Sequence, residues 1–333
     1  MISVIIPVYN GEKYIEKIIG CFERQIYNNF ELVFVNDGSK DKSLKVLNRI
    51  KNNSNLKIIV ITQQNSGVSK ARNVGIENSK GEFICFCDVD DEVKENYISD
   101  MRLIMENNNV DLVICKHQWI KANEKETTFM KETGTGEVII KNSVSCLRDF
   151  LYGRIKSGCW TTMTRKSIIL NNDLHFMGGY MYSEDLHMLW RIIASSRNIA
   201  YLDKHLYIYK SHDNSTSAKF NENRLDGYKL MKNLELFFEK NVPEFSSEYK
   251  LYGASKLMWS IVWQAAIYYD YKKFKTFCIY NKVKNDMVKL LTFKKFYIQL
   301  SAFVFCVSLR MFRYFSILFG EKYTNFSKVL NDE

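Results

Sequence analysis

Short apolar runs alternate with helix-length amphipathic segments over the first 120 residues of the chain. The apolar runs are rich in β-branched and aromatic residues and predict strands at residues 3–8, 31–35, 57–61, 82–87 and 111–115. The segments between them predict helices at residues 12–25, 41–51, 68–78 and 96–107. This order is typical of βαβ units with right-handed crossovers, so we expect an α/β fold with a doubly wound, mainly parallel sheet.

The pattern changes further along the chain. Residues 121–203 are irregular, with a turn at residues 134–136, a short strand at residues 137–140 and loops around Gly158 and Gly178. From residue 221 onward helical periodicity dominates, at residues 225–239 and 249–269 and along a final segment that reaches residue 319. We therefore expect an α/β domain over residues 1–220 and a helical C-terminal region over residues 221–333.

Composition excludes disordered and disulfide-scaffold proteins, because 46% of the 333 residues are apolar and 25% are charged. The net charge of +10 favours an anionic partner, which can be a nucleic acid, a phosphorylated ligand or an acidic membrane. Residues 270–333 hold 12 Lys+Arg against 5 Asp+Glu, so most of the excess lies in the C-terminal segment. The eight cysteines lack zinc-ligand spacing, and the N-terminus lacks a signal-peptide pattern, so we expect buried thiols in a cytoplasmic protein.

Residues 295–319, placed on one helix, form two faces. One face holds Lys295, Gln299, Cys306, Arg310 and Arg313, and the other holds Leu300, Val304, Val307, Met311, Phe315 and Leu318. The longest uncharged run, 14 residues between Lys295 and Arg310, is too short to span a bilayer. Two interpretations remain: an interfacial helix at the inner face of the cell membrane, or a helix packed on the α/β domain or on a second subunit of a homo-oligomer.

Polar or turn-forming loops follow the first four predicted strands, where an open parallel sheet binds its ligands. These loops are residues 7–11, 36–39, 63–67 and 88–91. Asp88 and Asp90 are spaced so that both can approach one divalent cation, and carboxylate oxygens suit Mg²⁺ or Mn²⁺ together with substrate phosphates. A solvated acidic turn is the alternative. A calcium loop is excluded because Val93 and Ser99 stand where glycine and glutamate are needed, and the chain has neither a P-loop nor a dinucleotide fingerprint.

Five motifs together resemble the family 2 inverting nucleotide-sugar glycosyltransferases of GT-A fold. In order they are residues 3–10 (SVIIPVYN), 36–39 (NDGS), 64–75 (QNSG with ARNVG), 88–91 (DVDD) and 183–185 (SED), within a resemblance that covers residues 1–215. The resemblance implies a nucleotide-binding half over residues 1–120 and an acceptor-side half over residues 121–220. One departure is Val89, where the family often has a small polar residue, which should affect local packing more than metal binding.

The resemblance also implies roles for the donor-binding residues. Pro7 and Tyr9 would wall the nucleotide base, and Asp37 would accept a hydrogen bond from a uracil ring, which favours a UDP-sugar. Asn65 and Arg72 would contact base or phosphate, with an exposed helix charge as the alternative for Arg72. In the Asp-x-Asp motif, Asp88 would lie near the ribose with Val89 beside the nucleotide sugar, and Asp90 would bind the metal.

On the acceptor side, Asp185 resembles the general base that deprotonates the acceptor hydroxyl, with Glu184 as its support. The alternative is that both acids only favour the helix dipole. His212 would be a third metal ligand, or a structural or exposed histidine. Trp160 is expected to pack against the protein, with stacking on the acceptor sugar as the second interpretation.

The sequence therefore predicts a metal-dependent, inverting, hexosyl-type glycosyltransferase. It would transfer sugar from a UDP-sugar to a glycan acceptor, lipid-carrier-linked in one interpretation, during synthesis of a surface polysaccharide such as capsule, exopolysaccharide or O-antigen. The alternative is a non-catalytic nucleotide-sugar-binding or assembly protein. A nucleic-acid partner is not expected, because no recognition motif accompanies the charge.

Overall fold

The structure is a computed structural model that describes residues 1–121, 134–211 and 220–320. The chain forms two compact units. The α/β unit consists of Met1–Cys146, Ser157–Gly179 and Glu184–Asn214, and the helical unit consists of Leu147–Lys156, Tyr180–Ser183 and Ser215–Glu333. Two short segments of the helical unit thus lie within the range of residues expected for the α/β domain.

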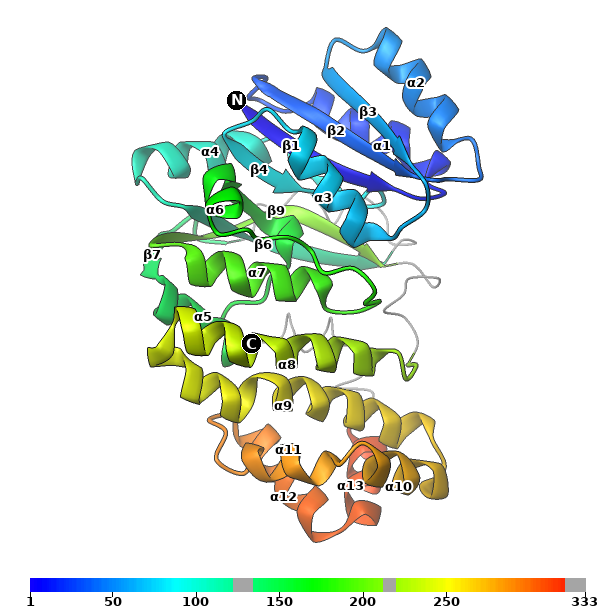
Figure 1. Ribbon diagram of the computed structural model, residues 1–333, viewed down its shortest axis with the longest axis vertical. Helices are drawn as coiled ribbons and strands as arrows, with labels where there is room; N and C mark the ends of the chain where they lie inside the picture. The colour runs from blue at the N-terminus through cyan, green and yellow to red at the C-terminus, as the bar shows by residue number, and fades with distance from the viewer. Residues whose placement is uncertain (122–133, 212–219, 321–333) are drawn as a thin grey trace. The chain divides into compact units, whose positions relative to one another are not determined.

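The first half of the sheet is parallel, as predicted. It contains β1 (Ile2–Val8), β2 (Phe30–Asp37), β3 (Lys57–Gln63) and β4 (Phe83–Phe86), in the spatial order β3-β2-β1-β4 (Figure 1). β1 pairs in parallel with both β2 and β4, and β2 with β3. All four carboxyl ends therefore meet at one edge of the sheet.

The second half of the sheet is mixed. Its strands are β5 (Glu92–Val93), β6 (Leu112–Lys121), β7 (Val138–Asn142), β8 (Thr162–Arg165) and β9 (Asn198–Ser211). β8 lies between β4 and β6 and runs antiparallel to both, whereas β6 and β9 are parallel. β5 and β7 pair antiparallel with β9. The β6–β9 pair carries a β-bulge near Lys116, which bends this part of the sheet.

The helices of the α/β unit cover both faces of its sheet, which gives the doubly wound arrangement. They are α1 (Glu12–Glu23), α2 (Ser43–Asn53), α3 (Val68–Asn78), α4 (Tyr97–Asn107), α6 (Lys166–Asn171) and α7 (Glu184–Ser195), with the first turn of α5 (Ser143–Leu151). Side chains on β1 alternate between the faces. Val4 and Ile6 join a cluster with α1 and α4, while Ile5 faces α3 so closely that a Cβ atom at Gly75 would overlap it.

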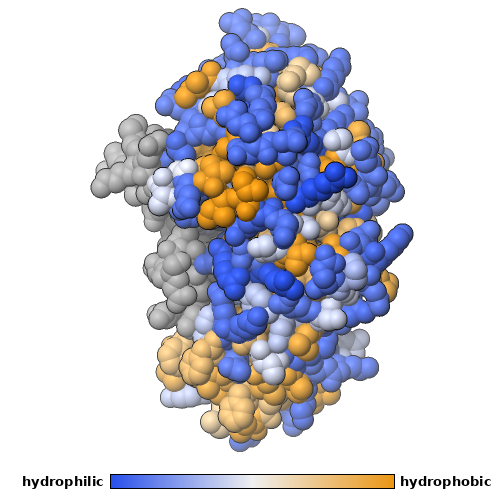
Figure 2. All heavy atoms as spheres, turned by 90° about the vertical axis from the view of Figure 1, so that its left-hand side faces the viewer, coloured by the Kyte–Doolittle hydropathy of each residue, from blue (hydrophilic) through white to orange (hydrophobic). Residues whose placement is uncertain are grey.

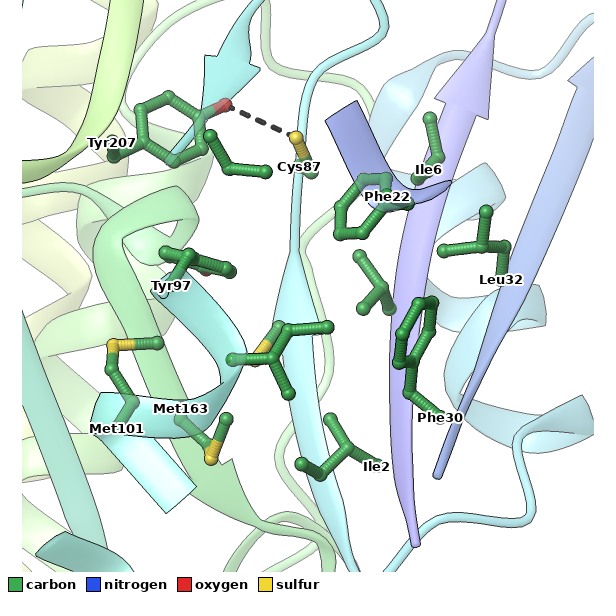
Figure 3. Close-up of a cluster of buried hydrophobic side chains, with 14 of the residues drawn as sticks. Ile2, Ile6, Phe22, Phe30, Leu32, Cys87, Tyr97, Met101, Met163 and Tyr207 are labelled. Atoms are coloured by element: carbon green, nitrogen blue, oxygen red, sulfur yellow. Dashed lines mark hydrogen bonds between the residues drawn. The ribbon is translucent and has the colours of Figure 1, made fainter. Parts of the chain in front are cut away.

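The main hydrophobic cluster lies between β1, β4 and the helices on that face. Phe22, Phe30 and Tyr97 are among its largest side chains, and Tyr207 enters it from β9 (Figure 3). The thiol of Cys87 lies 3.7 Å from the Tyr207 hydroxyl at the edge of the cluster (Figure 3). All eight cysteines are free thiols, and seven of them are buried, as predicted.

The helical unit contains six long helices within the described residues. They are α8 (Arg224–Asn241), α9 (Pro243–Tyr268), α10 (Tyr271–Tyr280), α11 (Val283–Leu290), α12 (Phe296–Val307) and α13 (Leu309–Leu318). Pro243 occupies the first turn of α9, where its missing N–H costs nothing. Within the part of the chain that the structure describes, no helix combines the length and the apolar character needed to cross a bilayer.

The prediction of one continuous helix over residues 295–319 is wrong. Ser308 has an extended conformation and its hydroxyl accepts a hydrogen bond from Met311 N, so it ends α12 and caps α13. The buried side chains also differ from both predicted faces, because Ile298, Ala302 and Phe305 of α12 and Phe312 of α13 point into the unit. The residues expected on the apolar face include Leu300, Val307, Met311 and Leu318, which are exposed.

Candidate functional site

The loops that follow β1 and β2 are joined by hydrogen bonds. Asn10 N donates to Ser39 Oγ at 3.0 Å, and Asn10 Oδ1 accepts from Lys40 N at 2.8 Å. Gly11 N donates to Ser43 Oγ at 2.9 Å. Asn10 has a positive φ of 51°, a conformation that asparagine adopts more readily than most residues. These contacts fix the loop that carries Tyr9 and follows Pro7 at the end of β1.

Asp37 joins the second loop to the third. Its Oδ1 accepts from Gln63 Nε2 at 2.7 Å and from Ser66 N at 2.8 Å, and its Oδ2 accepts from Gly67 N at 2.9 Å. A carboxylate offers about four acceptor positions, so one position on Oδ2 remains beyond these bonds. Asn65 approaches the same turn, because a Cβ atom at Gly38 would lie 2.7 Å from Asn65 N.

Arg72, on α3, joins two acidic motifs. Its guanidinium is buried, lies over the Phe176 ring and forms ion pairs with Asp88 at 2.9 Å and with Glu184 at 3.2 Å. Burial opposes the charged form, but Asp88, Glu184 and Asp185 together raise the pKa of Arg72. Arg72 is therefore a permanent cation that holds the Asp-x-Asp turn beside the Glu184–Asp185 pair, and the exposed-charge interpretation is wrong.

The Asp-x-Asp turn is fixed by Asp91 and Tyr207, to which the sequence analysis gave no role. Asp91 is buried and accepts hydrogen bonds from Tyr207 Oη at 2.7 Å and from Lys210 N at 2.9 Å. The Tyr207 hydroxyl in turn accepts from Asp88 N at 3.2 Å. Burial and then the Asp88 charge raise the pKa of Asp91 well above its usual range. The sequence carries no signal that separates Asp91 from Asp90, because the contact with Tyr207 joins residues far apart in the chain.

Val89 and Asp90 lie within this turn. Val89 packs against the hydrophobic cluster and against Gly11, where a Cβ atom would lie 3.2 Å from Val89 Cγ1. Asp90 is partly exposed at the same edge as Tyr9, whose side chain is 49% exposed, and Pro7, which is also partly exposed. The loops after β1 and β4 thus meet, and Asp90 remains accessible to a ligand.

Glu184 and Asp185 form the first turn of α7. Asp185 Oδ1 accepts from Leu186 N at 2.7 Å. Burial and the Asp185 charge raise the pKa of Glu184 to about 7, against the opposing effect of Arg72. Burial also raises the pKa of Asp185, and Arg72 again acts in the opposite direction. A carboxylate whose pKa is raised toward neutrality is suited to accept a proton, although both acids also favour the helix dipole.

Gly158 and Trp160 lie beside Asp185. A Cβ atom at Gly158 would overlap Trp160 Nε1 and would lie 3.0 Å from Asp185 Oδ2. The neighbouring Cys159 Sγ donates to the carbonyl of Asp185 at 3.0 Å. Trp160 packs against His117, Tyr207 and Tyr209, with ring centroids 4.7 to 5.6 Å apart. The expected packing role of Trp160 is confirmed, and its ring also borders the Asp185 carboxylate.

Few described side chains at this site could ligate a metal ion. In residues 1–121, 134–211 and 220–320, no group of three or more His, Cys, Asp and Glu side chains could hold an ion. His212 lies outside the described residues. A partly exposed carboxylate at Asp90 nevertheless fits Mg²⁺ or Mn²⁺, because these ions commonly take one or two protein carboxylates and complete their shell with substrate phosphates and water.

A parallel sheet whose loops converge on an Asp-x-Asp turn, with an acidic pair held beside it, defines the chain as a GT-A-type α/β protein. Residues 3–169, half of the chain, match the family called Glycosyl transferase family 2. The chain belongs to that family.

Two bacterial relatives show how far the similarity extends. EpsH of Bacillus subtilis (strain 168), provisionally named as a glycosyltransferase, is 28% identical over 244 residues, which is 72% of this chain and 70% of EpsH. TarS of Staphylococcus aureus (strain Mu50 / ATCC 700699), a poly(ribitol-phosphate) beta-N-acetylglucosaminyltransferase, is 25% identical over 209 residues. That match covers 62% of this chain but only 35% of TarS.

Solved structures share the fold. A crystal structure of S. aureus TarS 1-349 in complex with UDP-GlcNAc has a TM-score of 0.62 at 20% identity and covers 99% of this chain and 90% of that one. The mannosyltransferase PcManGT of Pyrobaculum calidifontis, in complex with GDP-Man and Mn²⁺, has a TM-score of 0.57 at 13% identity, over 100% of this chain and 88% of that chain. At these identities the likeness concerns the GT-A fold alone.

Proposed function

We propose that this protein transfers a sugar from a UDP-sugar to a glycan acceptor, with inversion, during synthesis of a bacterial surface polysaccharide. The observation that carries the proposal is the position of Arg72, which pairs with Asp88 and with Glu184 across 112 residues of chain. A turn suited to a donor diphosphate and a pair of acids suited to proton transfer are thereby held together. The UDP-GlcNAc complex of the fold neighbour TarS adds support for the donor.

The donor would bind across the loops after β1 to β4. The base would lie against Pro7 and Tyr9, with the remaining acceptor position of Asp37 receiving a uracil N–H and Asn65 beside it. Asp88 and Val89 would border the ribose and the sugar. Both terminal nitrogens of Arg72 pair with carboxylates, so we assign it to positioning Asp88 rather than to direct contact with base or phosphate.

Asp90 would hold the divalent cation, Mg²⁺ or Mn²⁺, with His212 as the further ligand in the proposal. When bound, the ion would offset the negative charge that develops on the departing diphosphate. The Mn²⁺ complex of the neighbour PcManGT and the partly exposed Asp90 both suit such a site.

Asp185 would act as the general base, supported by Glu184. It would remove the proton from the acceptor hydroxyl while that oxygen forms a bond to the anomeric carbon from the face opposite the diphosphate. The bond from the anomeric carbon to the diphosphate oxygen breaks, and UDP leaves with the electron pair. One displacement of this kind inverts the anomeric configuration.

In this proposal residues 1–120 bind the sugar donor and residues 121–220 bind the acceptor. The helical region would hold the enzyme at the cytoplasmic face of the membrane, near a lipid-carrier-linked acceptor. Figure 2 shows hydrophobic side chains gathered on the C-terminal helices. The exposed apolar residues of α12 are Phe296, Leu300, Phe303 and Val307. This helix has no charged residue and lies within a strongly basic segment. Apolar surface flanked by basic residues suits an anionic bilayer.

A panel of UDP-sugars incubated with the purified protein, with and without Mn²⁺, tests the proposal. We expect metal-dependent UDP release from one donor, and loss of release with retained UDP binding in Asp185→Asn. UDP binding without release from any donor, with or without acceptor glycans, would favour the alternative of a non-catalytic assembly protein. Absence of UDP binding would overturn both.

A further inference from the structure

Lysine side chains converge on one turn of the helical unit. Gly153 follows α5 in a left-handed conformation, with φ of 67°. A Cβ atom there would lie 3.5 Å from Lys256 Nζ on α9 and 3.5 Å from Lys295 Nζ at the start of α12. Because both nitrogens lie 3.5 Å from the same point, the two ammonium groups are at most twice 3.5 Å apart. Like charges repel at such a separation.

No carboxylate in the described part of the chain forms an ion pair with these two lysines. Lys256 Nζ donates to the carbonyl of Leu151 at 2.8 Å, and neither Lys256 nor Lys295 forms an ion pair within the described residues. Two nearby acids pair with arginines instead: Asp149 with Arg154 at 2.7 Å, and Glu248 with Arg148 at 2.8 Å. Asp286, the described acid nearest to Lys295 along the chain, accepts hydrogen bonds from Tyr228 and Ser255.

The protonated form of Lys256 is destabilised at this turn. Burial lowers the pKa of Lys256 to about 7, and the charges of Lys295 and Lys156 act in the same direction. An anion placed between the two ammonium groups would remove this repulsion. A doubly charged anion matches two lysines best, and lysine is a common phosphate ligand because it acts as a compact point charge.

We propose that Lys256 and Lys295 bind a phosphate ester at the Gly153 turn. The site lies within the helical unit and uses none of the residues assigned to sugar transfer, and its lipid form rests on the membrane contact proposed above for this region. The phosphate can belong to a lipid or to a soluble diphosphate. A lipid is the source we favour, because Phe296 follows Lys295 directly and is 74% exposed at the head of the apolar face of α12.

Binding of inorganic pyrophosphate, measured by calorimetry on the full chain, tests the anion site. We expect Lys256→Met and Lys295→Met each to weaken binding about tenfold, since a charge-assisted hydrogen bond is lost in each. Lys229→Met is the matched control, because Lys229 lies on α8 of the same unit and pairs with Asp226 at 3.1 Å. Within the described residues the Lys295 side chain makes no hydrogen bond, and its ammonium group lies 6.0 Å from the centre of the Tyr297 ring, so its variant should fold even if Lys256→Met does not.

Vesicle sedimentation identifies the source of the phosphate. If the source is a lipid, vesicles containing phosphatidylglycerol bind the wild-type protein, pure phosphatidylcholine vesicles do not, pyrophosphate competes, and both variants lose the binding. If the source is soluble, the variants lose pyrophosphate binding while their vesicle binding equals that of the wild type. Wild-type affinity of the Lys295→Met variant for both pyrophosphate and phosphatidylglycerol vesicles overturns the proposal.

Discussion

Arg72 controls the proton affinity of the acidic pair as well as its position. Burial raises the pKa of both Glu184 and Asp185, and the Arg72 charge lowers both. The Asp185 charge also raises the pKa of Glu184, and the same repulsion between the two carboxylates opposes ionisation of Asp185. A general base must be unprotonated, so a raised pKa of Asp185 makes activity fall at a higher pH than an ordinary aspartate would. Removing the negative charge of Glu184 and removing the positive charge of Arg72 should therefore shift the acidic limb of the pH–rate profile in opposite directions.

We expect Glu184→Gln to move the acidic limb of the kcat profile to lower pH by about one unit, because a neighbouring negative charge is removed. Arg72→Gln should move it to higher pH by a similar amount, and Arg72→Lys, which keeps the charge, should leave it nearly unchanged. The measurement is the rate of UDP release as a function of pH. An acidic limb that is the same in all three variants would show that Asp185 is not the titrating base.

Gly158 provides a second prediction for a single residue. Because a Cβ atom there would overlap Trp160 Nε1 and crowd Asp185, Gly158→Ala should displace the proposed base and reduce kcat by about 100-fold. Gly178→Ala is the matched control, since nothing lies within 4 Å of a Cβ atom at that position. Equal turnover of both variants would mean that the spacing between Gly158, Trp160 and Asp185 does not matter for transfer.

The link between β9 and the turn after β4 depends on one hydroxyl. In Tyr207→Phe, the buried Asp91 carboxylate loses a donor and Asp88 N loses an acceptor, so we expect a loss of about 1–3 kcal/mol in the free energy of unfolding. Tyr201→Phe, on the same strand, removes a hydroxyl that makes no hydrogen bond within the described residues. Chemical denaturation of both variants checks this, and equal losses would contradict it.

The predicted elements show which features a sequence pattern can supply. The strands and helices of residues 1–120 were predicted closely because their periodicity is local and their hydrophobic faces are distinct. The position of β8 between β4 and β6 could not be predicted, since strand pairing joins segments far apart in the chain. The end of α12 at Ser308 was missed because no proline or glycine marks it, and because α12 is apolar on all sides.

For the candidate site, too, local features could be predicted and contacts between distant segments could not. The loops at the carboxyl ends of β1 to β4 were predicted from topology, which brings them to one edge. The partner of Arg72 across 112 residues and the structural role of Asp91 depend on tertiary contacts, and no spacing rule encodes them. The roles assigned to individual site residues remain predictions that the experiments above test.

At the scale of the whole molecule, the exposed apolar face of α12 is the feature that a protein acting alone in water does not need. Phe303 is 57% exposed and Val307 is 60% exposed, one turn apart on a helix without charges. If this face contacts lipid, Phe303→Glu with Val307→Glu should reduce binding to phosphatidylglycerol vesicles at least tenfold, about 1.4 kcal/mol, because apolar burial is lost and like charge is added. Leu236→Glu is the matched control, since Leu236 is 74% exposed on α8 of the same unit. Should the double variant bind vesicles normally but lose self-association in sedimentation velocity, the face belongs to a second subunit instead, and the membrane contact is refuted.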